Sequence, residues 1–467
     1  MASPLPAPPR VEPTELATPP ALPAKWTATA LLTPFPDNGT AQAPWAAEVT
    51  YDWSVQAMRV SCYSLDGGSL DIVAVGDGSY YELVGGKCYG PYPMPEWSVP
   101  SPTWLANRDL VCNGVADVLG VSCQWWSGTT PCENSLEHEG SKPSCANDTW
   151  CAGAWIWARA DNGFPWRIML ISQGNPYQLP VLGDCALVHL PTFQQVGETK
   201  LPQILASCPK QSAERPPQGS VAEALRRSAQ SATDEQRGAV SDAVGRLIPG
   251  LAPLPGTCTP YALPTWPTTL YMTAITTPTF PYQETPTGPW YTDPYPTQIF
   301  YDTTDKNAPQ QLSRFYQPDG TIQDTLLLEP TSYGVNRDAN GNVTSCGLLD
   351  PNPNDPNIGA PVWDWPANDG ATCLAMLENN PQLSPGKVTL IIGCPSDHGR
   401  AFYIWYTSDG EAVMFTEVPQ CCDVSLTLID YDAYVADPEL PPGIFDIPPQ
   451  CQQAATSRAA APRVLAL

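Results

Sequence analysis

The sequence predicts a mainly β protein built as two tandem antiparallel meander sheets, or half-barrels, joined by a short helical linker. Three observations predict this fold class. Apolar and polar residues alternate with a period of two over many short segments, Asp-Gly pairs of the kind that form hairpin turns separate them, and the pattern occurs twice along the chain. At 467 residues the chain is long enough for two or three domains of ~100–200 residues each.

The alternation is clearest where Val49, Tyr51 and Trp53 take turns with polar neighbours, as expected for a half-buried strand. The same order of strands and turns recurs in the second half. The matched stretches are 26–36 with 270–281, 48–52 with 298–302, 62–67 with 315–320, and 155–163 with 403–410. Each copy contains about eight to ten strands joined mostly by short turns, which favours an up-and-down sheet or a partly closed barrel.

These patterns divide the chain into five segments. We expect a disordered Pro-rich arm over 1–24, a first β unit over 25–208, a helical linker or lid over 209–257, a second β unit over 258–451, and a disordered tail over 452–467.

The linker carries the helical signals. Ser220 with Glu223, and Thr233 with Gln236, have capping-box spacing, and Pro249-Gly250 marks a stop. We favour a linker that packs on one β unit over the alternative, a lid above a ligand cavity.

Cysteine positions also recur. The chain has 16 cysteines, and five cysteine positions match in order between the halves: Cys88 with Cys346, Cys112 with Cys373, Cys123 with Cys394, Cys185 with Cys421 or Cys422, and Cys208 with Cys451. A shared frame of this kind favours disulfides over buried thiols, with the pairing left open. The candidates are Cys88, Cys112, Cys123, Cys185, Cys208, Cys346, Cys373, Cys394, Cys422 and Cys451.

Disulfides predict an extracellular or other oxidising compartment, although the first ten residues lack the apolar core of a secretory signal. The net charge of -25 disfavours nucleic acid as a partner, and no apolar run reaches the ~18–20 residues of a membrane span. Sequons make Asn38, Asn147 and Asn342 candidate glycosylation sites.

Several motifs resemble those of the half-barrel lipid carriers, the architecture shared by bacterial outer-membrane lipoprotein carriers and ependymin-related secreted proteins. They are Tyr51-Asp52, Tyr63 with Asp66-Gly67, the strand end at 80–83, and the hairpin leading into a strand over Asp161–Arg167. The resemblance implies a concave apolar sheet that binds a lipid-like or other hydrophobic molecule. Two such units in one chain depart from the usual pattern of either family.

Aromatic residues on the predicted strands are the candidate ligand-binding set, although strand aromatics mostly pack in cores and we expect at most half of the first-unit set to face a cavity. The set is Tyr51, Trp53, Tyr63, Trp155, Trp157, Trp166, Tyr301, Tyr316, Tyr403 and Trp405. The predicted partner is a hydrophobic small molecule such as a lipid or pigment. Sugar stacking on exposed Trp is the alternative use.

An enzyme is the less favoured hypothesis. His138, His189 and His398 have no counterparts in the other repeat, and neither G-x-S-x-G nor H-E-x-x-H occurs. A glycoside hydrolase with two catalytic carboxylates remains an alternative, because the sequence does not show which of the 47 acidic residues lie close together. We expect no cofactor. The stretches 338–342 and 350–357 are rich in Asp and Asn, whose side-chain oxygens are suitable calcium ligands. We favour the alternative that these residues form solvated turns.

Overall fold

The fold is described from a computed structural model. It describes residues 5–9, 19, 21–35, 40–93, 99–103, 110–131, 150–170, 181–182, 185–209, 220–254, 256, 258–278, 294–317, 319–328, 332–348, 360, 370–395, 401–418 and 427–452. Cys132, Cys145, Cys421, Cys422, Asn38, Asn147, His138, His398 and the stretch 350–357 lie outside the described residues.

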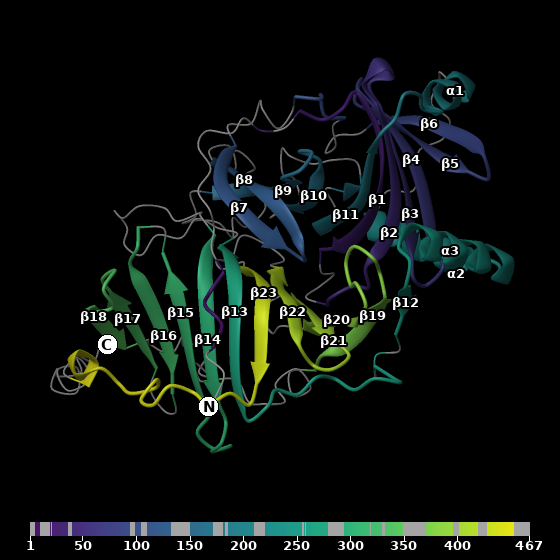
Figure 1. The fold of residues 1–467 in the computed structure, drawn as a ribbon. Coiled ribbons are helices and arrows are strands. Elements are labelled where there is room, and N and C mark those ends of the chain that lie inside the picture. The colour runs from purple at the N-terminus through teal and green to yellow at the C-terminus, as the bar shows by residue number, and fades with distance from the viewer. Residues whose placement is uncertain are drawn as a thin grey trace, which may run out of the picture.

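Two large antiparallel sheets form the molecule, one after the other in the sequence (Figure 1). The first is an 11-stranded sheet. Its strands are β1 (Lys25–Pro34), β2 (Trp45–Asp52), β3 (Ala57–Ser64), β4 (Ser69–Val75), β5 (Ser79–Val84), β6 (Lys87–Pro93), β7 (Val111–Val118), β8 (Val121–Pro131), β9 (Trp150–Arg159), β10 (Pro165–Leu170) and β11 (Cys185–Gln195).

The second sheet has 12 strands. They are β12 (Leu251–Pro253), β13 (Thr269–Pro278), β14 (Tyr295–Asp302), β15 (Gln310–Tyr316), β16 (Ile322–Leu327), β17 (Tyr333–Arg337), β18 (Val343–Leu348), β19 (Thr372–Glu378), β20 (Val388–Pro395), β21 (Ala401–Thr407), β22 (Ala412–Val418) and β23 (Thr427–Ala436). The mainly β fold class predicted from the alternation is confirmed.

The two sheets follow the same path. The order β6-β5-β4-β3-β2-β1-β11-β10-β9-β8-β7 in the first sheet is repeated by β18 to β13 and then β23 to β19 in the second, with β12 added at the β19 edge. Each sheet is therefore two meanders, joined by the pairing of β1 with β11 in the first sheet and of β13 with β23 in the second. The chain crosses from β6 at one edge of the first sheet to β7 at the other edge. The sequence did not predict this crossover, because turn residues do not indicate which strands pair.

Register repeats as well. Trp26 lies opposite Tyr51 in the first sheet, and Leu270 lies opposite Tyr301 at the matching position of the second. A register shift follows Thr29 in β1 and Thr273 in β13 at the same point of the ladder. Such bulges bend a strand locally, so both sheets bend at the same place.

Helices are few. A helical turn over 449–452 contacts the second sheet through Cys451, and the other described helices lie beside the first sheet. They are the 3₁₀ turn η1 (Trp53–Val55), α1 (Leu201–Ser207), α2 (Val221–Ser231) and α3 (Asp234–Leu247). The predicted strand through Trp53 ends one residue early, because Asp52 caps η1 by accepting a hydrogen bond from the Ser54 amide at 3.0 Å. The predicted caps are confirmed: Ser220 accepts from the Glu223 amide, and Thr233 with Gln236 forms a complete capping box.

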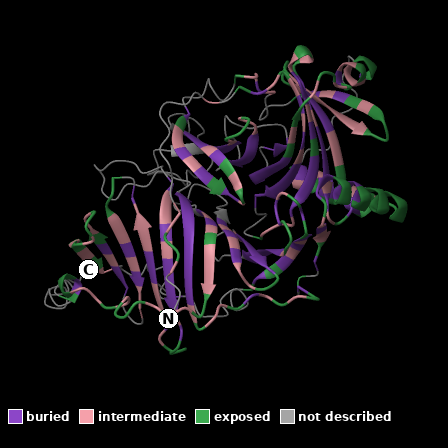
Figure 2. Cartoon of the chain, in the orientation of Figure 1, coloured by how far each residue is buried: buried purple, intermediate pink, exposed green. Residues whose placement is uncertain are grey.

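The core is continuous between the sheets, where Figure 2 shows long buried runs. One apolar cluster includes Trp125, Trp155, Trp157 and Trp166 of the first sheet together with Trp405 of the second. The opposite faces carry separate apolar clusters, one that contains Tyr51 and one that contains Tyr301.

Candidate functional site

The predicted aromatic set is divided by the structure into packed and accessible members. Tyr51, Trp155, Trp157, Trp166, Tyr301, Tyr403 and Trp405 are buried, whereas Trp53, Tyr63 and Tyr316 are half-buried. The indole N–H groups of the buried tryptophans named here have no acceptor among the described residues. These side chains therefore act mainly by apolar packing between sheets.

Equivalent faces of the two sheets meet at this cluster. By register, the positions of Leu31, Trp157, Arg167 and His189 in the first sheet match those of Ile275, Trp405, Met414 and Asp430 in the second. The His189 ring lies 5.2 Å from the Trp405 ring. The interface is therefore pseudo-twofold. Its polar groups break the symmetry, because Arg167 is matched by Met414 and His189 by Asp430.

A buried ion pair crosses this interface. Arg167 Nη1 and Nη2 donate to the two carboxylate oxygens of Asp430 at 2.7 and 2.8 Å, and Arg167 Nε donates to His189 Nε2 at 3.1 Å. The guanidinium also lies 5.2 Å from the Trp157 ring. Arg167, the last residue of the quoted Asp161–Arg167 motif, therefore joins the two sheets.

His189 is held neutral by this arrangement. Complete burial, followed by the adjacent Arg167 charge, lowers the pKa of His189 well below its usual value. Since Nε2 accepts from Arg167, the remaining proton belongs on Nδ1. A general-base role would require access that this ring lacks.

We expect His189 to make stability depend on pH. In the unfolded chain the imidazole takes up a proton below about pH 6.5, whereas the folded state resists it, so its stabilisation is complete above that pH and is lost as the pH falls. Urea unfolding from pH 7 to 5 should show an extra loss approaching ~1.4 kcal/mol per pH unit relative to His189→Gln. Parallel pH profiles would contradict this account.

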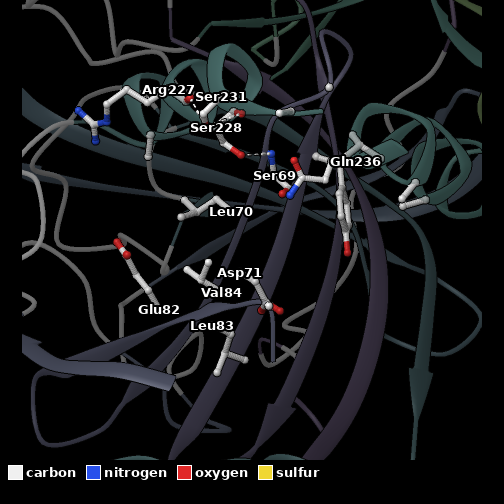
Figure 3. Close-up of a pocket in the computed structure, with 18 of the residues that line it drawn as sticks. Ser69, Leu70, Asp71, Glu82, Leu83, Val84, Arg227, Ser228, Ser231 and Gln236 are labelled. Carbon is white, nitrogen blue, oxygen red and sulfur yellow. Dashed lines mark hydrogen bonds between the residues drawn. The ribbon is translucent and has the colours of Figure 1, made fainter. Parts of the chain in front are cut away.

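A cavity lies between the helical linker and the first sheet. Its volume is about 650 Å³, and it is lined from β3, β4 and β5 on one side and from α2 and α3 on the other. In Figure 3, Arg227 and Ser228 of α2 lie across from Leu70 and Glu82. Helices α2 and α3 pack on the first sheet and also wall a cavity, whereas Leu251–Pro253 of the same predicted linker forms β12 and pairs with β19 of the second sheet.

Close backbone packing holds α2 in place. Ser228 Oγ accepts a hydrogen bond from the Ser69 amide at 3.1 Å, drawn in Figure 3. A Cβ at Gly68 would lie 2.2 Å from the Leu225 carbonyl oxygen, so only glycine permits this approach. The helix is therefore fixed against the β3–β4 hairpin.

The cavity lining is amphipathic. Apolar lining comes from Leu70, Leu83, Val84, Ala239 and Val240, and charged lining from Asp71, Glu82, Arg227 and Arg246. Asp71 is paired with Arg59, whose Nη2 lies 2.6 Å away.

Burial raises the pKa of Glu82, with Arg227 opposing that rise. Burial, then the charges of Asp71 and Glu48, raises the pKa of Tyr63. Of the predicted aromatic residues that the structure describes, only Tyr63 lines this cavity.

A second cavity, of about 380 Å³, lies between the sheets. It is bounded by Leu119 and Gly120 of the first unit and by Lys387, Glu411 and Tyr434 of the second. The Lys387 ammonium and Glu411 carboxylate pair at 2.8 Å, and Asp432, which accepts a hydrogen bond from Thr273, also lines this cavity.

Three disulfides are present among the described residues: Cys88–Cys208, Cys258–Cys373 and Cys346–Cys451. The first and third join cysteines that the sequence comparison matched between the halves. Cys258 was not among the candidates, and Cys123 was wrongly included. Cys123 keeps a buried thiol, because the strand ladder encloses it, and burial raises its pKa to about 12.

The loop 338–342 is a turn stabilised by its own side chains. Asp338 accepts hydrogen bonds from the amides of Asn340 and Asn342, each at 2.9 Å, and from the Asn342 side chain. These bonds, chiefly those from Asn342, lower the pKa of Asp338. No group of three or more metal-ligating residues occurs in the described ranges. Asn342 is exposed, as a glycosylation acceptor must be.

The described helices include none with the length and apolar character needed to cross a bilayer. Asp430 and the cavity residues on α2 and α3 were missed from sequence. The available signal for Asp430 was an acid within the apolar strand pattern that begins at Val424. No comparable signal marked the cavity.

No family model and no curated protein matches the chain. Among solved structures it is similar to the Pseudomonas aeruginosa MucA/MucB complex, with 15% identity over 67% of this chain and 82% of that chain and a TM-score of 0.23. A DUF1329 family protein from Desulfovibrio piger has 14% identity over 38% of this chain and 90% of that chain, with a TM-score of 0.21. Likeness at this level assigns no function.

Proposed function

We propose that the protein is a non-enzymatic binder of a hydrophobic, amphipathic small molecule, held between α2–α3 and strands β3–β5. The observation that carries this proposal is the 650 Å³ cavity with apolar side chains on both walls. Its size falls within the ~300–1,000 Å³ typical of small-molecule sites.

The lining favours a ligand with an apolar body and a polar or anionic head. Leu70, Leu83 and Val240 offer apolar contacts, while Arg227 and Arg246 supply positive charge. Arg227 is only loosely held by Glu223, at 3.9 Å, which leaves its guanidinium donors available to a ligand. The resemblance to half-barrel lipid carriers suggested by the motifs points to the same ligand class.

A carbohydrate-binding function has less support. Sugar stacking needs accessible indole faces, and the Trp side chains whose burial is described are buried or, as at Trp53 and Trp266, only half-buried. The enzyme hypothesis receives no stronger support, because the buried histidine is locked into the inter-sheet ion pair.

We also infer that the halves are copies of one β unit. Matching strand order, matching bulge positions and the corresponding disulfides Cys88–Cys208 and Cys346–Cys451 support this inference. The disulfides favour an oxidising, extracytoplasmic compartment.

Filling the cavity should weaken binding. Ala239 is an exposed α3 residue that lines the cavity, so Ala239→Trp should weaken binding of anilinonaphthalene sulfonate, an apolar ring system with an anionic head, at least ~10-fold. Fluorescence titration gives the affinity. Ser241→Trp, exposed on the same helix but outside the lining, is the matched control.

Near-ultraviolet circular dichroism should show both variants folded, since molten states also bind this dye. Equal affinities in the two folded variants would reject the cavity as the binding site.

A further inference from the structure

A short Pro-rich segment of the chain lies on the second sheet. In residues 5–9, Leu-Pro-Ala-Pro-Pro, the Leu5 side chain packs against the apolar cluster of Tyr271, Phe300 and Leu312. Tyr271 donates its hydroxyl hydrogen to the Pro6 carbonyl. Figure 1 shows this end of the chain beside β13 and β14. Pro6 and Tyr271 are 265 residues apart in the sequence, so their hydrogen bond is a tertiary contact.

A chain of hydrogen bonds orients the tyrosine that meets Pro6. Tyr316 donates to Gln298 Oε1, and Gln298 Nε2 donates to Tyr271 Oη at 2.8 Å. The Tyr271 hydroxyl hydrogen is thereby directed at the proline carbonyl. Burial raises the pKa of Tyr271, and the hydrogen bond to Gln298 opposes the rise, so the hydroxyl stays protonated as a donor at neutral pH.

This chemistry suits a segment rich in proline. Proline has no backbone N–H, so an extended segment of this kind presents carbonyl acceptors, and aromatic grooves with hydroxyl donors recognise it. Leu5 adds an apolar anchor beside the carbonyl contact. Side-chain packing and one directed donor together make a recognition site for a Leu-Pro sequence.

The equivalent face of the first sheet lacks this chain of hydrogen-bond donors. By register, Thr27 and Glu48 occupy the positions of Tyr271 and Gln298. Threonine is too short to replace the tyrosine, and an ionised glutamate can only accept hydrogen bonds. The donor chain is therefore specific to the second sheet.

We propose that Tyr271, Gln298 and Tyr316 form a docking site for an extended Leu-Pro segment, and that the chain's own residues 5–9 are its releasable occupant. The site is independent of the cavity under α2 and α3. Tethering gives the segment an effective concentration of order mM, so it competes with the same sequence added in solution.

The test uses protein lacking residues 1–19 and a fluorescein-labelled peptide of residues 3–12. Fluorescence anisotropy should show saturable binding to the truncated protein and at least ~10-fold weaker binding to the full chain. Tyr271→Phe in the truncated protein should weaken binding about fivefold, as expected for one lost hydrogen bond. Tyr333→Phe, in the same apolar cluster, is the control.

A peptide with Leu5→Asp should not bind. Absence of saturable binding by truncated protein that retains its circular dichroism would overturn the proposal, as would equal binding by the two tyrosine variants. Sedimentation should show the full chain as a monomer. A dimer that dissociates on truncation would instead assign the segment to a second copy and overturn the intramolecular assignment.

Discussion

Replacement of Arg167 by methionine should lower the free energy of unfolding by about 3–5 kcal/mol, the largest effect expected of any single substitution considered. The substitution leaves the Asp430 carboxylate, whose side chain is 8% exposed, without its bidentate partner. A buried charge without a partner costs several kcal/mol, whereas methionine approximates the volume of the arginine stem. Urea denaturation followed by circular dichroism measures the loss.

Two controls separate the buried charge from a general effect of losing arginine. The double variant Arg167→Met/Asp430→Leu should recover most of the stability, because no unpaired charge remains. Arg59→Met removes an arginine from a pair whose side chains are 31% and 24% exposed, and should cost only ~0–1 kcal/mol. A similar loss for Arg167→Met and Arg59→Met would contradict the role given to the inter-sheet pair.

Removal of the Cys88–Cys208 disulfide by Cys88→Ala/Cys208→Ala should cost about 2–5 kcal/mol. The bond spans 120 residues and ties the end of α1 to the edge strand β6. Without it the unfolded chain gains freedom, and the seven-residue α1, whose Leu201 packs with Ala57 and Val73, is too short to persist alone. Thermal unfolding and limited proteolysis within 196–209 provide the readouts.

Cys123→Ala is the comparison for that experiment, because it removes a buried thiol that is outside any disulfide. It should cost about 1 kcal/mol. The account fails if the double alanine variant is no less stable than Cys123→Ala and its α1 region resists protease equally.

Local signals predicted the elements of this fold well. Asp66-Gly67 and Asp319-Gly320 form turns in which Gly67 and Gly320 have φ of 95° and 85°, values that glycine accepts readily. Ser220 and Thr233 cap the two linker helices as their spacing predicted. Turns and helix caps depend only on residues that are close together in the sequence, so they can be predicted from one sequence.

Long-range features were hidden for the same reason. The Trp155 and Trp157 pattern indicated a strand but could not show that its face meets the second sheet. Arg167 and Asp430 lie 263 residues apart, and neither spacing nor composition pairs them. The cavity also needed tertiary structure, because its walls come from strands and helices separated by more than 100 residues.

Native mass spectrometry of the purified full chain, followed by organic extraction and mass analysis, tests the binding function most directly. We predict a bound species that is extracted as an amphipathic small molecule, is retained by Ser241→Trp, and is lost from folded Ala239→Trp. A ligand retained equally by both variants, or full-chain protein that neither carries nor takes up a lipid-like molecule, would contradict the account.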